Sequence, residues 1–125
     1  MFYLKNKYFA RWASKEKMSD EILNKAIQEF ENELFEANLG NHLFKKRVAS
    51  KNKGKSGGFR TIVFYQKGKK LIFCFGFSKS QQESLSRQEM LLLNKLSDIY
   101  QKMTDEDIVK NIKYKELIKI MITET

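Results

Sequence analysis

The chain has 125 residues, a formal net charge of +9 and an apolar fraction of 42%, which predict one folded domain over residues 1–125 and exclude a disordered chain. No apolar run approaches the roughly 20 residues of a transmembrane helix, and the N-terminus lacks the features of a signal peptide, so we expect a cytoplasmic protein without a membrane partner. The single cysteine, Cys74, excludes an internal disulfide and stands in the apolar segment LIFCFGF, where a buried thiol is expected.

The positive charge is concentrated in the middle third of the sequence. Residues 37–82 hold 11 of the 24 bases and no Asp or Glu, whereas the other 79 residues carry 13 bases and 15 acids. Such segregation predicts a polyanionic partner, which would be nucleic acid, an anionic membrane or an acidic protein. A solvated lysine-rich surface is the alternative interpretation.

The N-terminal third has the pattern of two helices. Apolar residues on one helical face predict a helix over residues 7–17. Ser19, followed by Asp20 and Glu21, is typical of an N-cap with acids in the first turn. We expect this second helix to end near residue 37 or 38, before Gly40.

The middle third changes to the pattern of strands. Residues 42–49 are strand-like, and a glycine-rich loop is expected between them and residue 59. Residues 59–66 and 71–77 are rich in β-branched and aromatic residues, and the segment 67–70 between them is typical of a hairpin connection. Both hairpin strands are apolar on nearly both faces, so they are expected to be central and covered by helices.

The C-terminal third begins with a capping box, in which Ser86 is followed three residues later by Glu89. The helix that it opens is expected to face inward with Leu92, Leu93, Leu96, Ile99 and Met103. Thr104 is expected to cap a further helix through Ile112, and the tail forms either a last strand or a frayed end. The predicted fold class is α+β, with two N-terminal helices packed on an antiparallel sheet and C-terminal helices after it.

The hairpin also predicts which residues meet across its strands. If the turn lies at residue 68, paired positions sum to about 136, which places Arg60 opposite Gly76. Gly76 would leave room there for the close approach of a backbone. An arginine at the entrance of a buried strand is costly unless it is paired or exposed, and no acid lies near Arg60 in the sequence.

This pairing predicts a basic rim, which we define as residues 53–60 together with residues 76–79. The lysines of the glycine-rich loop and Lys79 would emerge at the same end of the sheet, and Lys46 or Arg47 would join them if it faces the same side. The aromatic residues of these strands are expected to belong to the core. His42, the single histidine, is expected to be an exposed residue at a strand start.

The residue inventory restricts the chemistry of the rim. The segment GKSGG lacks the first glycine of a P-loop, because residue 49 is Ala, and it precedes a strand, which argues against nucleotide binding. One histidine excludes a two-histidine ribonuclease, and the residues supply neither a zinc set nor carboxylates for two metals, so no metal and no cofactor is expected. What remains is metal-free phosphate chemistry, in which cations hold the phosphate and the 2′-hydroxyl of RNA is the nucleophile. Plain RNA or DNA binding fits the same residues.

Four segments carry a resemblance to a known family: FARWASKEKMSDEIL, EANLGNHLFKKRVA, GKSGGFRTIVFYQKG and FCFGFSKS. In this order they are similar to the RelE-like toxins of type II toxin–antitoxin modules, in the HigB-like branch, over residues 7–112. The resemblance implies the small α+β RelE fold. It also implies an mRNA interferase that cuts mRNA, typically on the ribosome, through the RNA 2′-hydroxyl.

The resemblance implies a protein partner as well. The cognate antitoxin, encoded in an adjacent gene and carrying a helix-turn-helix pattern, would block the basic site. Operator DNA would be bound only through this antitoxin, which represses the shared operon. Two other interpretations stay open, namely a ParE-like toxin that binds DNA gyrase without cutting RNA, and an inactive relative that only binds its antitoxin.

By motif, the resemblance implies catalytic roles for Arg60, Lys79 and Lys55, with Arg60 and Lys79 on the scissile phosphate. The residues expected to bind RNA are Lys45, Lys46, Arg47, Lys51, Lys53 and Ser78, and Lys46 is an alternative to Lys55 as the assisting group. The catalytic tyrosine of some RelE relatives matches neither Tyr100 nor Tyr114. The chain also reads SQQESL at residues 80–85, where relatives often have asparagine, which leaves the role of Glu83 open.

Overall fold

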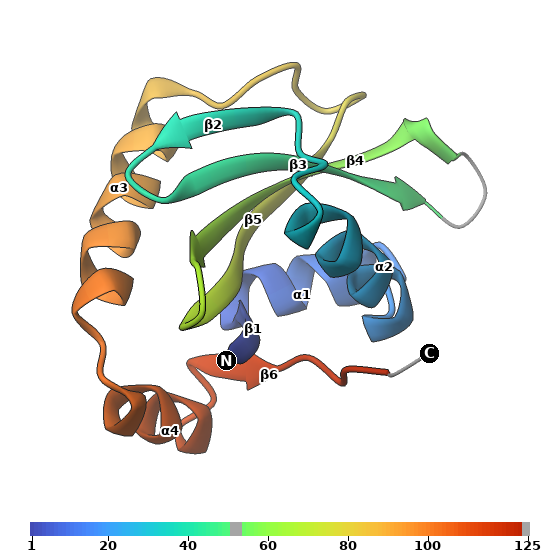
Figure 1. Cartoon of the computed structure of the whole chain (residues 1–125). Helices are drawn as coiled ribbons and strands as arrows, with labels where there is room; N and C mark the ends of the chain where they lie inside the picture. The colour runs from blue at the N-terminus through green and yellow to red at the C-terminus, as the bar shows by residue number, and fades with distance from the viewer. Residues whose placement is uncertain (51–53, 124–125) are drawn as a thin grey trace.

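The computed structural model describes residues 1–50 and 54–123, and within these ranges six strands form one sheet with four helices around it (Figure 1). The elements in chain order are β1 (Phe2–Asn6), α1 (Lys7–Lys15), α2 (Asp20–Glu31), β2 (Ala37–Gly40), β3 (Leu43–Ser50), β4 (Gly54–Gln66), β5 (Lys70–Ser78), α3 (Arg87–Lys102), α4 (Asp105–Lys113) and β6 (Leu117–Lys119). None of the helices in these ranges combines the length and the apolar character that crossing a membrane requires.

The sheet is mixed, with the strand order β2-β3-β4-β5-β1-β6. Strand β1 runs parallel to β5 and antiparallel to β6, and the other neighbours are antiparallel. The α+β class agrees with the sequence prediction, but an all-antiparallel sheet was wrong, because the N-terminal segment that forms β1 had not been assigned to any element. The tail forms the last strand, β6, beside β1.

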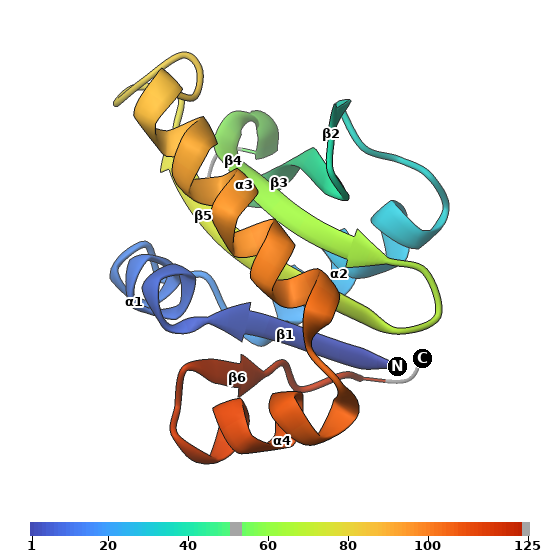
Figure 2. The same cartoon turned by 90° about the vertical axis from the view of Figure 1, so that its left-hand side faces the viewer.

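Helices cover both faces of the sheet. Helices α1 and α2 pack on one face, where Phe9 and Phe30 meet Phe73 in a buried apolar cluster. Helix α3 crosses the opposite face (Figure 2), where Leu93 and Ile72 belong to a second buried cluster. Alternate residues of each central strand therefore point into different clusters. The central positions predicted for β4 and β5 are confirmed.

Helix α2 ends earlier than the sequence indicated. Ser19 caps it, as predicted, by accepting a hydrogen bond from the Ile22 N–H at 3.4 Å. The helix ends at Glu31, and Glu33 adopts a positive φ of 63°, through which a right-handed helix does not continue. Residues 37 and 38, near which the helix had been expected to end, belong instead to β2, which pairs with β3.

Helix α3 presents a narrower face to the core than predicted. The capping box of Ser86 and Glu89 is present, and a second one opens α4 at Thr104. Leu92 and Ile99 are 59% and 52% exposed, so the prediction that they face inward was wrong. Leu93, also predicted to face inward, is buried, and Ser97 and Tyr100 are the other buried residues of the helix.

The thiol of Cys74 is buried, as expected, and burial raises its pKa to about 12. The same face of the sheet also buries a lysine. The Lys70 ammonium donates hydrogen bonds to the carbonyl oxygens of Tyr100 and Met103 at 2.6 and 2.7 Å, and its burial lowers its pKa. This lysine satisfies carbonyl groups at the C-terminal end of α3.

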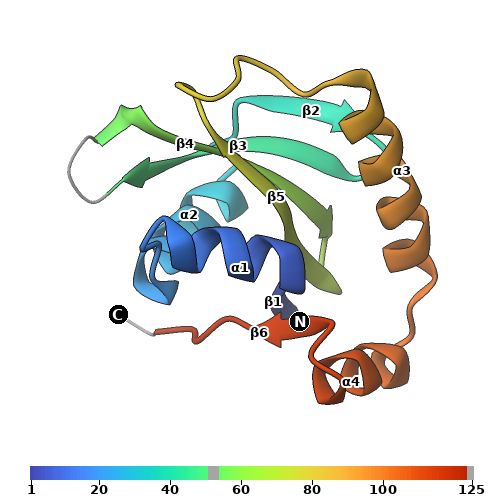
Figure 3. The ribbon, with the colours of Figure 1, turned by 180° about the vertical axis from the view of Figure 1, so that it is seen from behind.

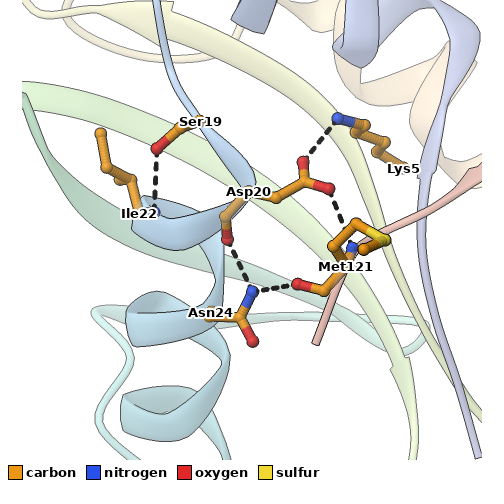
Figure 4. A network of polar contacts seen from close by, with 6 residues as sticks. All are labelled: Lys5, Ser19, Asp20, Ile22, Asn24 and Met121. Atoms are coloured by element: carbon orange, nitrogen blue, oxygen red, sulfur yellow. Dashed lines mark hydrogen bonds and ion pairs between the residues drawn. The ribbon is translucent and has the colours of Figure 1, made fainter. Parts of the chain in front are cut away.

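The chain after β6 is fastened to α2 by a polar network (Figure 4). The Asp20 carboxylate accepts hydrogen bonds from the Lys5 ammonium and from the Met121 N–H, both at 2.8 Å. The Asn24 amide donates to the Asp20 and Met121 carbonyl oxygens, and its own oxygen accepts from the Thr123 N–H. The network therefore links β1, α2 and the tail.

Asp20→Asn is expected to lower the free energy of unfolding by about 1 kcal/mol at pH 7, because the ion pair to Lys5 is lost at a partly exposed site. Burial raises the pKa of Asp20, but the hydrogen bonds from Lys5 and Met121 outweigh it, and the net shift is downward. The pKa of Asp20 is lower in the folded state than its unfolded value near 3.8. The ionised carboxylate therefore stabilises the fold at a pH above 3.8, and this stabilisation is lost as the pH falls through the folded-state pKa. Urea unfolding should show a larger difference at pH 7 than at pH 3, whereas Glu21→Gln, on the exposed first turn, should change little at either pH.

Candidate functional site

The pairing of β4 with β5 differs by one residue from the predicted register. Arg60 lies opposite Phe77, and Thr61 lies opposite Gly76. Near the turn, the numbers of paired residues sum to 136, as predicted. The register then shifts at a bulge between Ile62 and Val63, where Cys74 is the additional residue on β5. The prediction that Arg60 faces Gly76 was therefore wrong.

The corrected register gathers a row of side chains across three strands, which we call the Arg60 row. Arg47 on β3 pairs with Arg60 on β4, which pairs with Phe77 on β5. Directly paired residues point to the same face of a sheet, so the two guanidinium groups and the Phe77 ring share one face. This face is the one that α3 covers further along, because Ile62, two residues from Arg60, packs in the cluster with Leu93. The β3–β4 hairpin extends beyond the rest of the sheet at this end (Figure 1).

Arg60 is the electrostatic centre of this row. It is 7% exposed, and its Nη1 atom is buried without a hydrogen-bond partner in the described part of the chain. A guanidinium group does not lose its proton in a protein, so the charge remains. Arg47, directly opposite, is exposed and carries the same charge. An anion that enters this face would satisfy a buried donor and relieve the repulsion between two cations.

Lys46 does not belong to this face. It alternates with Arg47 along β3, so it points toward α2, where its ammonium lies 2.9 Å from a carboxylate oxygen of Glu29. Its side chain is 2% exposed. A buried and ion-paired lysine cannot reach RNA without leaving its partner. The expectation that Lys46 binds RNA or assists catalysis therefore does not agree with the structure.

Gly76 makes room for a side chain and not for a ligand. Helix α1 lies against β5 (Figure 3), and a Cβ atom on Gly76 would stand 2.2 Å from the Trp12 ring. Trp12 also meets Phe59 edge to face, with ring centroids 5.2 Å apart. The indole thus fills the space that the sequence had suggested for a close backbone approach, and this space lies on the face opposite to Arg60.

The other predicted residues are placed less centrally. Lys79 is exposed and directly follows β5, whereas Ser78 pairs with Phe59 and so lies on the face of Trp12. Lys45 is two residues from Arg47 and on the same face. Lys55 belongs to β4, so the glycine-rich segment from Gly54 onward is strand and not loop. Lys51 and Lys53 lie outside the described residues.

Neither tyrosine belongs to the Arg60 row, although Tyr100 packs further along the same face of the sheet, against Phe64. Tyr100 is 5% exposed inside the α3 cluster, where burial raises the pKa of its hydroxyl, and it accepts a hydrogen bond from Asn6. Tyr114 is exposed at the end of α4. His42 is exposed at the start of β3, as expected, with Nδ1 3.2 Å from the Tyr65 carbonyl oxygen. Glu83 is exposed in the segment between β5 and α3.

A groove of about 400 Å³ lies beside Lys45, and the sequence had not indicated it. Strands β2 and β3 form one wall, and the segment before α3 together with the start of α3 forms the other. We call it the α3 groove, and its main lining residues are Leu39, Lys45, Ser84, Leu85, Arg87 and Met90. A signal was present in the sequence, since Arg87 places a positive charge in a first helical turn, where the helix dipole favours acids.

Within the described ranges, no group of three or more His, Cys, Asp or Glu residues has the arrangement of a metal site. The face consists of cations, an aromatic ring and a groove. It is suited to hold phosphate groups and flat rings, which together make up a polynucleotide.

Comparison with known proteins gives a family. The sequence model of the RelE toxin, from the RelE/RelB toxin–antitoxin system, matches residues 1–120. No curated protein matches the chain. The match spans nearly the whole sequence and includes the three strands of the Arg60 row. The chain therefore belongs to the RelE toxin family.

Proposed function

We propose that this toxin is a metal-independent endoribonuclease of the HigB-like branch, which cuts mRNA on the ribosome in the cytoplasm and so stops translation. The observation that supports this proposal is the buried Nη1 atom of Arg60, which has no hydrogen-bond partner among the described residues and lies opposite a second arginine. An unsatisfied buried cation is costly, and such sites are commonly functional.

The reaction needs no metal ion. The 2′-hydroxyl oxygen attacks the adjacent phosphorus and gives up its proton to a base or to water, while the bond from phosphorus to the 5′-oxygen breaks and that oxygen takes up a proton. The products are a 2′,3′-cyclic phosphate and a 5′-hydroxyl. Arg60 would donate to a non-bridging oxygen, whose negative charge grows in the transition state. Lys79 would hold the same phosphate, Lys55 would assist, and Arg47 and Lys45 would bind the neighbouring phosphates. Lys51 and Lys53, which we also propose as RNA-binding residues, would extend this binding.

The cognate antitoxin would act on the same face. A toxin of the RelE/RelB system has an antitoxin as its partner. We propose that this antitoxin, a helix-turn-helix protein from the adjacent gene, covers the Arg60 row and supplies the only link to operator DNA. An acidic segment of the antitoxin that binds these arginines would prevent RNA binding both electrostatically and sterically.

Mapping of RNA 5′ ends after induction tests this function. The wild type should produce discrete cuts with 5′-hydroxyl ends, and the purified protein should cut in EDTA. Arg60→Ala should reduce cleavage by about 10²–10³-fold, because it removes a donor to the transition state. Equal cleavage by this variant would refute the role of Arg60. Growth arrest with intact mRNA and blocked DNA supercoiling would establish the gyrase-binding alternative instead.

A further inference from the structure

The α3 groove has the composition of a site for a flat, partly polar ring. Leu39, Leu85 and Met90 supply apolar walls, and all three belong to or pack on the α3 cluster, which fixes their positions. Its volume of about 400 Å³ falls within the range of roughly 300–1,000 Å³ that is usual for small-molecule sites. A methionine and two leucines can pack on both sides of a planar ring.

Three polar side chains of the groove, Lys45, Ser84 and Arg87, have no side-chain partner among the described residues, whereas the hydroxyl of Ser86, which also lines it, accepts from the Glu89 N–H. The Ser84 hydroxyl forms no hydrogen bond with the described residues, whereas its carbonyl oxygen accepts from Gln82. Lys45 and Arg87 form no ion pair in the described ranges. One hydroxyl can therefore read the edge of a ring, and two cations can hold anionic groups at either end of it.

The wall before α3 is held in place by the capping box. The Glu89 carboxylate accepts hydrogen bonds from the Ser86 N–H at 2.8 Å and from the Gln82 amide at 3.0 Å. These contacts, the Ser86 N–H first, lower the pKa of Glu89, so the carboxylate is ionised at neutral pH. The groove is thus formed before a ligand enters, which reduces the entropy cost of binding.

The groove lies one step along the sheet from the Arg60 row. Lys45, which lines it, is two residues from Arg47 on the same face of β3, a separation of about 7 Å at the rise of a strand. One nucleotide of an extended single strand spans such a distance. We propose that the α3 groove holds the nucleobase next to the scissile phosphate, with Ser84 at its edge and Arg87 on the following phosphate. This inference rests on the proposed function, and it means that contacts in the groove determine the sequence specificity of cleavage.

Two exposed residues allow a test that spares the fold. Arg87→Gln should weaken binding of a short single-stranded RNA by about tenfold, and Lys95→Gln, on the outer face of the same helix, should leave it unchanged. Ser84→Ala should change the base found beside the cut while cleavage continues, and Ser14→Ala, on exposed α1, should not. Unchanged binding and unchanged base preference in both groove variants would overturn the proposal.

A second measurement separates this inference from the proposed function. Adenosine, guanosine, cytidine and uridine 5′-monophosphates are added to the intact protein, and the NMR signals of Leu85 and Met90 are followed. Selective shifts for some bases, lost in Ser84→Ala, support the groove whether or not RNA is cut. Cleavage without such shifts would overturn base binding in the α3 groove alone. Shifts without cleavage would overturn the proposed nuclease activity alone. The absence of both would overturn both proposals.

Discussion

Arg60→Met is expected to abolish toxicity and, at the same time, to raise the melting temperature. The wild-type side chain buries a permanent charge and faces a second arginine, and its Nη1 atom has no partner in the part of the chain that the structure describes. Methionine fills a similar volume without the charge, which should stabilise the fold by about 1–2 kcal/mol. For a domain of this size this corresponds to a rise of roughly 4–8 °C in the melting temperature. Calorimetry of the wild type and the variant measures the shift, and colony counts after induction measure toxicity.

Two further variants separate the charge from the shape of Arg60. Lys67→Met, in the exposed turn after β4, should leave both the melting temperature and toxicity unchanged. Arg60→Lys should keep the destabilising charge but lose most of the activity, because a lysine cannot reproduce the fork of a guanidinium. A lower melting temperature for Arg60→Met would mean that the arginine stabilises the fold, and the proposed phosphate site would lose its physical basis.

Glu29→Ala is expected to have the opposite effect on stability, with a loss of about 3 kcal/mol or more in the free energy of unfolding. It removes the carboxylate 2.9 Å from the Lys46 ammonium, whose side chain is 2% exposed, and leaves a buried cation without this partner. Urea denaturation at neutral pH measures the loss. A change below 1 kcal/mol would show that the ammonium escapes to water when Glu29 is absent.

The double variant Glu29→Gln, Lys46→Met should recover much of this stability, since neither charge is then buried alone. It should also cleave RNA at the wild-type rate at a temperature where it is folded, because Lys46 lies on the α2 face of β3. Loss of cleavage in a folded double variant would indicate that Lys46 does take part in RNA binding. These variants therefore test whether Arg60 serves function and Lys46 serves the fold.

The sequence predicted the class of the fold, and it indicated Arg60 as a candidate site residue, because both depend on local patterns. Caps at Ser19, Ser86 and Thr104 are read from neighbouring residues, and all three are present. Arg60 was identified because a charge at the start of an apolar strand has no local partner. The strand β1 was missed because its partners, β5 and β6, lie far from it along the chain.

The composition of the middle third suggested more bases for binding a polyanion than the structure leaves available. Two of its eleven bases, Lys46 and Lys70, are buried and serve the fold, one paired with Glu29 and one bound to carbonyl oxygens at the end of α3. Nothing in the local sequence distinguishes them from exposed lysines, since their partners lie 17 and 30 residues away. The bulge at Cys74 was equally hidden, because an apolar strand reads the same with or without an additional residue.

Trp12 gives the protein an intrinsic optical probe. It is the only tryptophan of the chain, and its ring lies on Gly76 and against Phe59, directly behind the strand positions that hold Arg60 and Phe77. The indole is not on the face proposed to bind RNA, so a ligand there would not quench it by contact. A change in its emission on addition of RNA or antitoxin would instead report a movement of β4 or β5. Binding and unfolding can therefore both be followed by fluorescence in the unlabelled wild type.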